Sequence, residues 1–434
     1  MDKIAKKINI ITLGCSKNLV DSEQFAAQAR IAGYNVVHNS SDLDFQIAIV
    51  NTCGFINDAK EESINMILQL ANLKENQELE KLIVFGCLTE RYMDDLKAEI
   101  PEVDVFIGNY DVNALLDSLQ IDFVEDKKYD RLYDSPGHYA YLKIAEGCNR
   151  KCAFCAIPGI KGKYVSRQMA DILTEAKQLA DDGVKEFILI CQDLSYYGYD
   201  IDRKFLLPEL VEELSKIEGV EWIRLHYLYP FLFPEKLIDV ITNNPKVCKY
   251  IDIPLQHITD RVLSAMNRGG TKQQTIELLA KFRAKMPDAV IRTTMLVGHP
   301  QETEEGFNEL LEFVAEQKFD RLGVFTYSEE EGTSAADKFE DDVPESVKFE
   351  REERLMELQR EISYNLNSKK VGKIFKVILD REEEEGFIGR TEFDSVEVDN
   401  EVIIESTEKL KIGEFYNVEI TGFEDYELFG VIVD

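Results

Sequence analysis

Three cysteines stand within eight residues of one another, close enough in the chain to bind one metal cluster together. Cys148, Cys152 and Cys155 have the spacing Cys-x3-Cys-x2-Cys. Three thiolates can hold three irons of a four-iron, four-sulfur cube and leave the fourth iron open to bind a reactant. The spacing therefore predicts an enzyme that carries a [4Fe-4S] cluster.

Two other interpretations of these thiols are weaker. Structural zinc needs four ligands, usually gathered as two pairs, and the nearest further candidates in the chain are His138 and Cys191. Unligated core cysteines are normally scattered among apolar residues, whereas Asn149, Arg150 and Lys151 separate the first two thiols. A cluster explains the segment better than either.

A second set of three cysteines follows three predicted strands. Cys15, Cys53 and Cys87 each come directly after an apolar, β-branched run. Because the carboxyl ends of parallel strands share one edge of a sheet, these thiols can converge there. The alternative is three buried cysteines that end strands by chance. We predict a second cluster, and we expect the remaining Cys191 and Cys248 to pack in a core.

Composition narrows the class of protein. The chain has 434 residues, 44% of them hydrophobic, and a net charge of −32. It has neither an apolar run long enough for a membrane span nor a recognisable signal peptide, so we expect a cytoplasmic protein whose thiols serve metal or redox chemistry. The charge disfavours a broad nucleic-acid surface and suits a basic partner, although solubility alone would also explain it.

The first 130 residues alternate short β-branched runs with helical stretches, which predicts a Rossmann-like, mostly parallel α/β domain over 1–130. The charged run at 125–131 is typical of a linker. The expected strands are 8–13, 36–37, 45–50, 82–85 and 105–107.

Residues 135–367 repeat a strand-helix unit six times, which predicts a partial (β/α)6 barrel. In such barrels the chemistry lies at the carboxyl ends of the strands, and Cys148 follows the first of them. The expected strands are 141–146, 186–193, 222–229, 250–256, 290–298 and 321–328. The expected helices include 171–182, 234–242, 271–285, 304–317 and 344–367.

The segment 368–434 contains five short β-rich runs separated by turns, which predicts a small antiparallel barrel. It has 8 Lys and Arg against 18 Asp and Glu, a net charge of −10. We expect such a module to recognise a basic surface rather than RNA. The expected strands are 374–379, 386–393, 401–405, 416–421 and 428–433.

Taken together, these features resemble the radical S-adenosylmethionine (SAM) methylthiotransferases over essentially the whole chain, with 368–434 similar to their TRAM domain. The segment 14–23, GCSKNLVDSE, and the segment 325–333, FTYSEEEGT, are similar to the branch that modifies a ribosomal protein. The branch that modifies tRNA adenosine usually has Gly-Cys-Gln-Met-Asn at the first position and an arginine at the second.

The resemblance implies two [4Fe-4S] clusters and SAM as cofactors. The cluster that binds SAM and releases a 5′-deoxyadenosyl radical would be held by Cys148, Cys152 and Cys155. The auxiliary cluster that carries sulfur would be held by Cys15, Cys53 and Cys87. The implied substrate is the β-carbon of an aspartate in a basic small-subunit ribosomal protein at the decoding centre. Each turnover would use one SAM as methyl donor and one as radical source, with flavodoxin or ferredoxin as electron donor and a separate sulfur source.

The resemblance also implies contacts to SAM near the strand ends. The residues concerned are Phe154, Gln192, Gln256 and Val297. A turn or a helix cap would explain Gln192 equally well. His299 and Gln301 depart from the family's Gly-Phe-Pro-Gly-Glu-Thr segment, which puts the detail of that loop in doubt. We expect His257 and His299 to form ordinary hydrogen bonds rather than to act in catalysis.

A basic stretch follows the first cysteine of the radical motif. Residues 148–167 include five Lys and Arg and no acidic residue. Within it, Lys163 and Arg167 are candidates to bind a carboxylate of SAM or of the substrate. The alternative is a solvated loop.

Two rival functions have different signatures. A tRNA adenosine methylthiotransferase would use the same cofactors, but it predicts salt-sensitive tRNA binding and a basic terminal barrel. A non-catalytic iron-sulfur carrier would need no SAM site, so it leaves the six-unit barrel and the open clusters unexplained.

Overall fold

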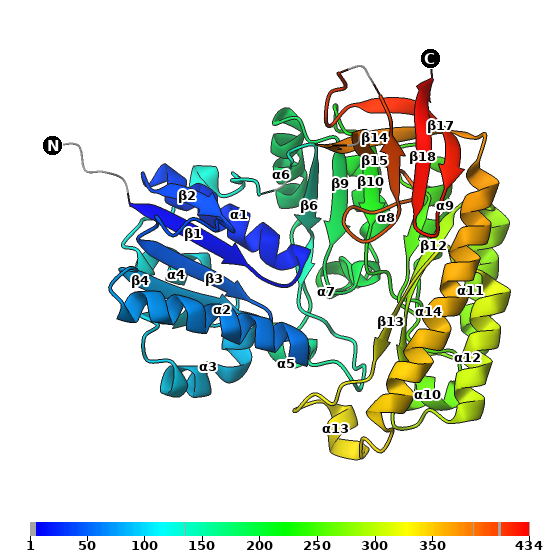
Figure 1. Cartoon of the computed structure of the whole chain (residues 1–434), viewed down its shortest axis with the longest axis horizontal. Coiled ribbons are helices and arrows are strands. Elements are labelled where there is room, and N and C mark those ends of the chain that lie inside the picture. The colour runs from blue at the N-terminus through cyan, green and yellow to red at the C-terminus, as the bar shows by residue number, and fades with distance from the viewer. Residues whose placement is uncertain (1–5, 135, 385, 407–408, 434) are drawn as a thin grey trace. The chain divides into compact units, whose positions relative to one another are not determined.

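The computed structural model describes residues 6–134, 136–384, 386–406 and 409–433 (Figure 1). Two compact units divide the chain: the first contains residues 1–135, 146–149 and 156–164, and the second contains the remainder. The division into domains at 1–130, 135–367 and 368–434 stays a prediction.

A parallel five-stranded sheet forms the centre of the first unit, as predicted. Its strand order is β2-β1-β3-β4-β5, and every neighbouring pair is parallel. The strands are β1 (Lys7–Thr12), β2 (Asn35–His38), β3 (Ile47–Thr52), β4 (Lys81–Gly86) and β5 (Val105–Ile107).

Helices cover both faces of this sheet. Successive strand residues point to opposite faces, so each strand contributes side chains to two cores. Ile47 and Ile49 belong to one core and Ala48 and Val50 to the other. Both cores are apolar, so the central strands are hydrophobic throughout, as expected for a doubly covered parallel sheet. The helices are α1 (Ser16–Ile31), α2 (Asn57–Glu75), α3 (Cys87–Glu99), α4 (Val112–Ser118), the 3-10 turn η1 (Glu125–Lys127) and α5 (Ile157–Lys161).

The predicted linker is wrong. The run 125–131 packs against α1 instead, where Gln28 Nε2 donates to the Lys127 carbonyl at 2.9 Å. Arg131 is buried and lies 3.5 Å from the carboxylate of Glu23. A run of charge does not by itself indicate a linker, because its charged residues can find partners in the fold. Here Glu23 pairs with Arg131, and Gln28 binds the backbone at Lys127.

Six parallel strands in two groups of three form the barrel of the second unit, which confirms the predicted repeat. The groups are β10-β9-β6 and β11-β12-β13, and the Leu228 amide, beyond β10, donates to the Asp252 carbonyl of β11 at 2.9 Å. The strands are β6 (Tyr139–Lys143), β9 (Glu186–Ile190), β10 (Trp222–Leu225), β11 (Tyr250–Asp252), β12 (Val290–Val297) and β13 (Arg321–Thr326). Two short strands lie between β6 and α6, β7 (Ala145–Glu146) and β8 (Val165–Ser166).

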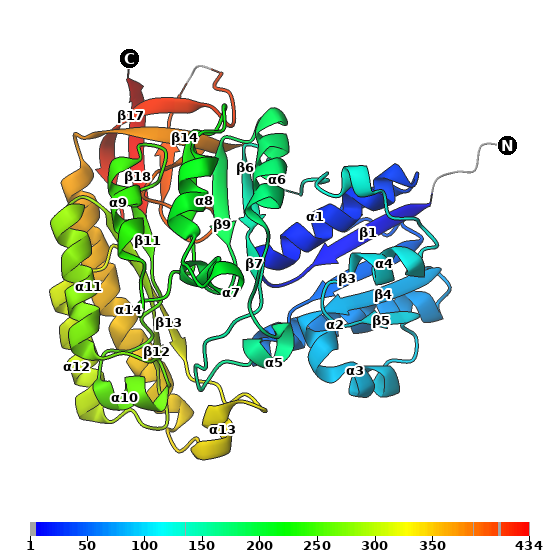
Figure 2. The same cartoon turned by 180° about the vertical axis from the view of Figure 1, so that it is seen from behind.

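The connecting helices lie outside these strands, as Figure 2 shows from behind. The longest, α14, packs along β13 and α12. The helices are α6 (Met169–Asp181), η2 (Leu194–Tyr196), α7 (Tyr199–Asp202), α8 (Leu207–Leu214), α9 (Glu235–Asn243), α10 (Asp260–Ala265), α11 (Lys272–Lys285), α12 (Glu304–Gln317), α13 (Ser334–Lys338), α14 (Glu345–Asn367) and η3 (Ser368–Lys370).

The terminal strands close into a five-stranded barrel, as predicted, in the order β14-β15-β16-β18-β17. One detail differs: β16 and β18 pair in parallel, whereas the other neighbours are antiparallel. Along the chain, β17 lies between β16 and β18 and runs antiparallel to both. The strands before and after it therefore point in the same direction. The strands are β14 (Ile374–Glu383), β15 (Gly386–Thr391), β16 (Glu401–Ile404), β17 (Phe415–Phe423) and β18 (Glu427–Val433).

Buried ion pairs join the terminal barrel to the strands of the larger barrel. Glu186, at the start of β9, lies between Arg224 of β10 and Arg390 of β15, and all three side chains are buried. Arg390 also pairs with Asp380 of β14 at 2.8 Å, and His138 contacts the same carboxylate at 2.7 Å. Breaking a buried pair leaves an uncompensated charge, so this layer fixes the position of the terminal barrel.

In the described part of the chain, no helix combines the length and apolar character that crossing a membrane requires.

Candidate iron-sulfur centres

The three strand-end cysteines of the first unit lie on segments that pack tightly together. A Cβ added to Gly14 would lie 2.6 Å from the Cβ and 3.0 Å from the Sγ of Cys53. A Cβ added to Gly54 would lie 2.6 Å from the Cα of Leu88, the residue after Cys87. The ends of β1, β3 and β4 therefore meet at the carboxyl edge of the sheet, where the sequence predicted a cluster.

The electrostatics of these thiols reflect their proximity. Burial raises the pKa of the Cys87 thiol to about 11; the Lys161 ammonium opposes this rise, and the thiols of Cys15 and Cys53 add to it. Burial, together with the charge of Cys15, also raises the pKa of Cys53. Three thiols that affect one another's ionisation in a partly buried site suit an iron-sulfur cluster, because soft thiolates select such clusters and coordination removes their protons.

Lys161 brings a positive charge into this group of thiols. Burial acts against its ionisation, but Glu146 and the thiols of Cys87 and Cys15 raise its pKa, so that it stays charged. The helix that carries it packs on Cys87 through Ile160. This cation compensates part of the negative charge that three thiolates bring.

Cys148, the first cysteine of the Cys-x3-Cys-x2-Cys motif, belongs to the first unit, where its amide donates to the Gly162 carbonyl at 3.1 Å. Gly147 before it has φ +78°, and a Cβ there would lie 2.2 Å from the Lys163 carbonyl oxygen. Only glycine fits this turn, so the backbone entering the motif is fixed by a close contact.

Cys152 and Cys155 belong to the second unit, in a loop with several anchors. The Cys155 amide donates to the Cys152 carbonyl at 3.2 Å. Between them, the Ala153 amide donates to the Met266 carbonyl and the Ala153 carbonyl accepts from the Ala335 amide, both at 2.8 Å. The loop is thereby held against the end of α10 and the start of α13.

The residues proposed to contact SAM lie at or near strand ends. Phe154 packs in an apolar cluster with Leu296, next to the buried Val297 that ends β12. Gln192 lies two residues after β9 and is partly exposed. Gln256 has φ +73°, a strained conformation for a side chain with a Cβ, and its amide donates to the Thr294 carbonyl at 2.8 Å. Their contact with SAM stays a prediction.

The basic stretch is partly neutralised within the fold. Arg150 Nε donates to Asp193 at 2.7 Å, and Arg167 pairs with the buried Glu175 at 2.6 Å. Arg167 also donates to the Lys143 carbonyl at 2.6 Å. Lys163 is exposed. Of the two candidates for a carboxylate, Lys163 is therefore the more accessible, and Arg167 is already engaged.

His257 forms the hydrogen bonds expected of it, whereas the buried Nε2 of His299 has no partner among the described residues. His257 lies 3.0 Å from Glu302 and accepts from the Thr259 amide at 3.1 Å, so both of its ring nitrogens are engaged. Burial lowers the pKa of His299 to about 4. Cys191 and Cys248 are both buried.

Within the described ranges, no three Cys, His, Asp or Glu side chains gather closely enough to hold one metal ion. A cube differs from a single ion in that each thiolate binds a different iron. Three features fit an iron-sulfur cube: the donors are all thiols, glycines let the strand ends approach closely, and the thiols affect one another's ionisation.

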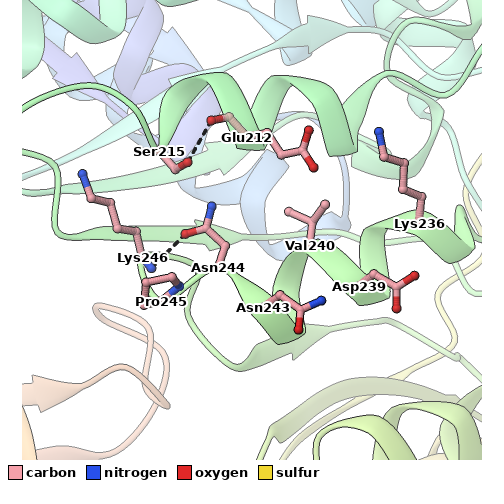
Figure 3. A pocket seen from close by; sticks show the side chains of 9 residues that line it. All are labelled: Glu212, Ser215, Lys236, Asp239, Val240, Asn243, Asn244, Pro245 and Lys246. Carbon is pink, nitrogen blue, oxygen red and sulfur yellow. Dashed lines mark hydrogen bonds between the residues drawn. The ribbon is translucent and has the colours of Figure 1, made fainter.

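A surface hollow lies away from these thiols. A cavity of about 680 Å³ is lined by residues of α8, α9 and the turn after α9 (Figure 3). The side chains lining it are polar apart from Val240 and Pro245, and two internal hydrogen bonds, from Ser215 to the Glu212 carbonyl and from the Lys246 amide to Asn244, brace its wall. None of the predicted site residues lines it.

Sequence reasoning missed Arg268 and Tyr229. Arg268 Nη1 donates to Cys152 Sγ at 3.2 Å, and its guanidinium lies 4.6 Å from the centre of the Tyr229 ring. Arg268 stands 116 residues after Cys152, in a loop without a distinctive spacing, so no local signal in the sequence indicated it.

Three family models match the chain in order along the sequence. The "Uncharacterized protein family UPF0004" matches residues 7–108, the "Radical SAM superfamily" matches 142–314 and the "TRAM domain" matches 371–433. Each matched range lies within one of the three expected parts.

Curated relatives match over nearly their full length. A protein of Bacteroides thetaiotaomicron is 53% identical over 430 residues, which are 99% of both chains. One of Bacteroides fragilis is 54% identical with the same coverage, and one of Flavobacterium psychrophilum is 51% identical over 98% of this chain and 97% of its own. All three are named ribosomal protein uS12 methylthiotransferase RimO.

Solved structures show the same fold at low identity. The radical SAM methyltransferase TsrM of Kitasatospora setae has a TM-score of 0.55 at 14% identity, covering 74% of this chain and 75% of its own. The cobalamin-dependent SAM radical enzyme OxsB has a TM-score of 0.53 at 10% identity, covering 82% and 56%.

Proposed function

The chain belongs to the ribosomal protein uS12 methylthiotransferases of the radical SAM superfamily, and from this premise we propose that it adds a methylthio group to the β-carbon of an aspartate in uS12. It is a transferase with a radical SAM domain, which implies SAM and a [4Fe-4S] cluster. The rival function on tRNA adenosine is disfavoured, because the full-length relatives carry the ribosomal-protein name.

The observation that carries the proposal is the convergence of Cys15, Cys53 and Cys87 at one sheet edge, in a chain that also has the Cys-x3-Cys-x2-Cys motif. A radical enzyme needs only one cluster with an open iron. A second thiol triplet supports the further step of sulfur insertion, because it can hold a cluster whose open iron binds sulfur.

The radical cluster would be held by Cys148, Cys152 and Cys155. The auxiliary cluster would be held by the strand-end cysteines, Cys15, Cys53 and Cys87. When bound, the first cluster and SAM supply a carbon radical able to remove hydrogen from an unactivated C–H bond. Phe154, Gln192, Gln256 and Val297 would then border SAM. The Lys163 ammonium would attract and orient the substrate carboxylate, since it is exposed and lies just beyond the motif.

The proposal requires three partners. The proposed substrate would be a basic protein, which would suit a chain of net charge −32. A one-electron donor such as flavodoxin or ferredoxin would reduce the radical cluster, and a sulfur source would replenish the auxiliary cluster. A cytoplasmic location would give access to all three.

Mass spectrometry of ribosomal proteins from cells with and without the gene tests the proposal. The aspartate peptide of uS12 should lack the methylthio mass in the deletion strain and regain it on complementation. Unchanged uS12 together with hypomodified tRNA adenosine would assign the chain to the tRNA reaction instead.

A further inference from the structure

Two arginines of the second unit lie over the same tyrosine ring. The guanidinium carbon of Arg150 is 3.9 Å from the centre of the Tyr229 ring, and that of Arg268 is 4.6 Å from it. Such contacts are attractive and strengthen when they are shielded from water. Tyr229 and Arg268 are both buried, so the ring fixes two cations at the carboxyl ends of the strands.

Each arginine is then directed to a different acceptor. Arg150 Nε donates to Asp193 at 2.7 Å, a carboxylate that is 2% exposed. Arg268 Nη2 donates to the Pro254 carbonyl at 2.6 Å, while its Nη1 donates to Cys152 Sγ at 3.2 Å. The Tyr229 hydroxyl donates back to the Arg268 carbonyl and closes the arrangement.

Arg268 donates directly to the sulfur of a candidate cluster ligand. Asp193 pairs directly with Arg150 and also attracts the Arg268 guanidinium, whose own hydrogen bonds go to Cys152 Sγ and the Pro254 carbonyl. A buried cation is costly unless it is paired and hydrogen-bonded. Cysteine binds iron as the thiolate, so Cys152 in a bound cluster would give Arg268 a direct anionic acceptor.

Hydrogen bonds to ligand sulfurs are among the factors that set the reduction potential of an iron-sulfur cluster. A cationic donor stabilises the additional negative charge of the reduced state and so raises the potential. We propose that Arg268 is a positioning residue that holds the Cys152 thiolate and raises the reduction potential of the cluster bound by the Cys-x3-Cys-x2-Cys motif. This inference depends on the proposed function for the presence of that cluster.

Arginine suits this position better than lysine would. Its planar fork donates to the sulfur and to the Pro254 carbonyl at once, and it stacks on the tyrosine ring. A lysine at 268 would keep the charge but lose the fixed geometry. Arg268→Lys should therefore retain part of the effect, whereas Arg268→Gln should lose it.

The test is a redox titration of the full-length, reconstituted protein, followed by electron paramagnetic resonance. All proteins carry Cys15→Ala, Cys53→Ala and Cys87→Ala, so that only the radical cluster is observed. We expect Arg268→Gln to shift the reduction equilibrium about tenfold toward the oxidised form, which is about 59 mV for a one-electron couple. Arg268→Lys should shift it less. Arg261→Gln, at an exposed arginine within α10, is the matched control and should cause no shift.

Each outcome bears on the inference. The inference would be overturned if the reduction potential of Arg268→Gln equalled that of the control. Loss of SAM binding at an unchanged potential would also overturn it, because the guanidinium would then bind SAM rather than tune the cluster. If Arg268→Gln fails to take up iron, Arg268→Lys decides: an unshifted potential there contradicts the inference. Absence of iron from the Arg261 control would instead refute the proposed cluster itself.

Discussion

At the scale of single residues, the proposed function depends on six cysteines and on Lys163. The two sets of thiols lie on separate segments of the chain. Among the auxiliary thiols Cys87 is buried beside Lys161, whereas Cys15 and Cys53 are partly exposed, as are the three thiols of the Cys-x3-Cys-x2-Cys motif. Since no cysteine belongs to both sets, the two sets should be separable by mutation.

Cys87→Ala should remove the auxiliary cluster alone. Bound iron should fall from about eight to about four per chain, because each cube holds four irons. Reductive cleavage of SAM should continue, while methylthio transfer to uS12 should be lost. Iron analysis and product assays on the anaerobically reconstituted protein measure these three quantities. Cys248→Ala is the matched control, a buried cysteine outside both sets, and iron loss there equal to that in Cys87→Ala would contradict the assignment.

Lys163→Ala should lower turnover about tenfold, because an exposed ammonium that orients a carboxylate makes a charge-assisted hydrogen bond. Both clusters should still form. The check is the rate of uS12 modification at saturating SAM, with the exposed Lys281→Ala as control. Equal rates in the two variants would remove Lys163 from the site.

At the scale of elements, the auxiliary site depends on how closely strand ends approach one another. The end of β3 reaches the start of α3 only because residue 54 has no side chain, since a Cβ there would lie 2.6 Å from the Leu88 backbone. Backbone cannot move aside as a flexible side chain can. The geometry of the thiols is therefore set by backbone packing.

Gly54→Ala should separate these elements. We expect a loss of stability of about 1–3 kcal/mol, typical of overpacking, together with loss of the auxiliary cluster. Denaturant unfolding of the apo-protein and iron content after reconstitution give the two readings. Gly159→Ala in α5 is the control, because nothing lies within 4 Å of a Cβ at that position. A fully loaded Gly54→Ala protein would show that the contact is not limiting.

At the scale of the whole molecule, a buried layer of charge joins the terminal barrel to the larger barrel. Burial acts against ionisation of Asp380, but the guanidinium of Arg390 and the imidazole of His138 keep its pKa below the ordinary 3.8. Burial also acts to raise the pKa of Glu186, but the guanidinium groups of Arg390 and Arg224 outweigh this effect and hold that pKa below 4.5. A carboxylate with a depressed pKa stabilises the folded state above its unfolded pKa, and this contribution is lost as the pH falls.

Asp380→Asn should destabilise the protein by about 3–5 kcal/mol at pH 7, because it leaves buried Arg390 with one anionic partner fewer. The difference from the parent should shrink as the pH falls below 3.8, since the parent carboxylate then loses its own charge. Urea unfolding of the apo-proteins between pH 3 and pH 7 measures this. Asp122→Asn, at an exposed site, should cost little at any pH. A difference for Asp380→Asn that does not vary with pH would contradict the ionic explanation.

The sequence by itself determined the thiols, the six-unit barrel and the terminal barrel, because spacing, strand periodicity and turn residues are local properties of the chain. Tertiary structure decided what depends on distant partners: the docking of 125–131 on α1, the parallel pairing of β16 with β18 and the placement of Arg268 on Cys152. Each of these brings together residues at least 23 positions apart along the chain, across elements whose orientation no local pattern encodes. Whether a charged residue is solvated or buried in a pair is set by its neighbours in space, and the sequence alone therefore left Arg131 and Arg268 unassigned.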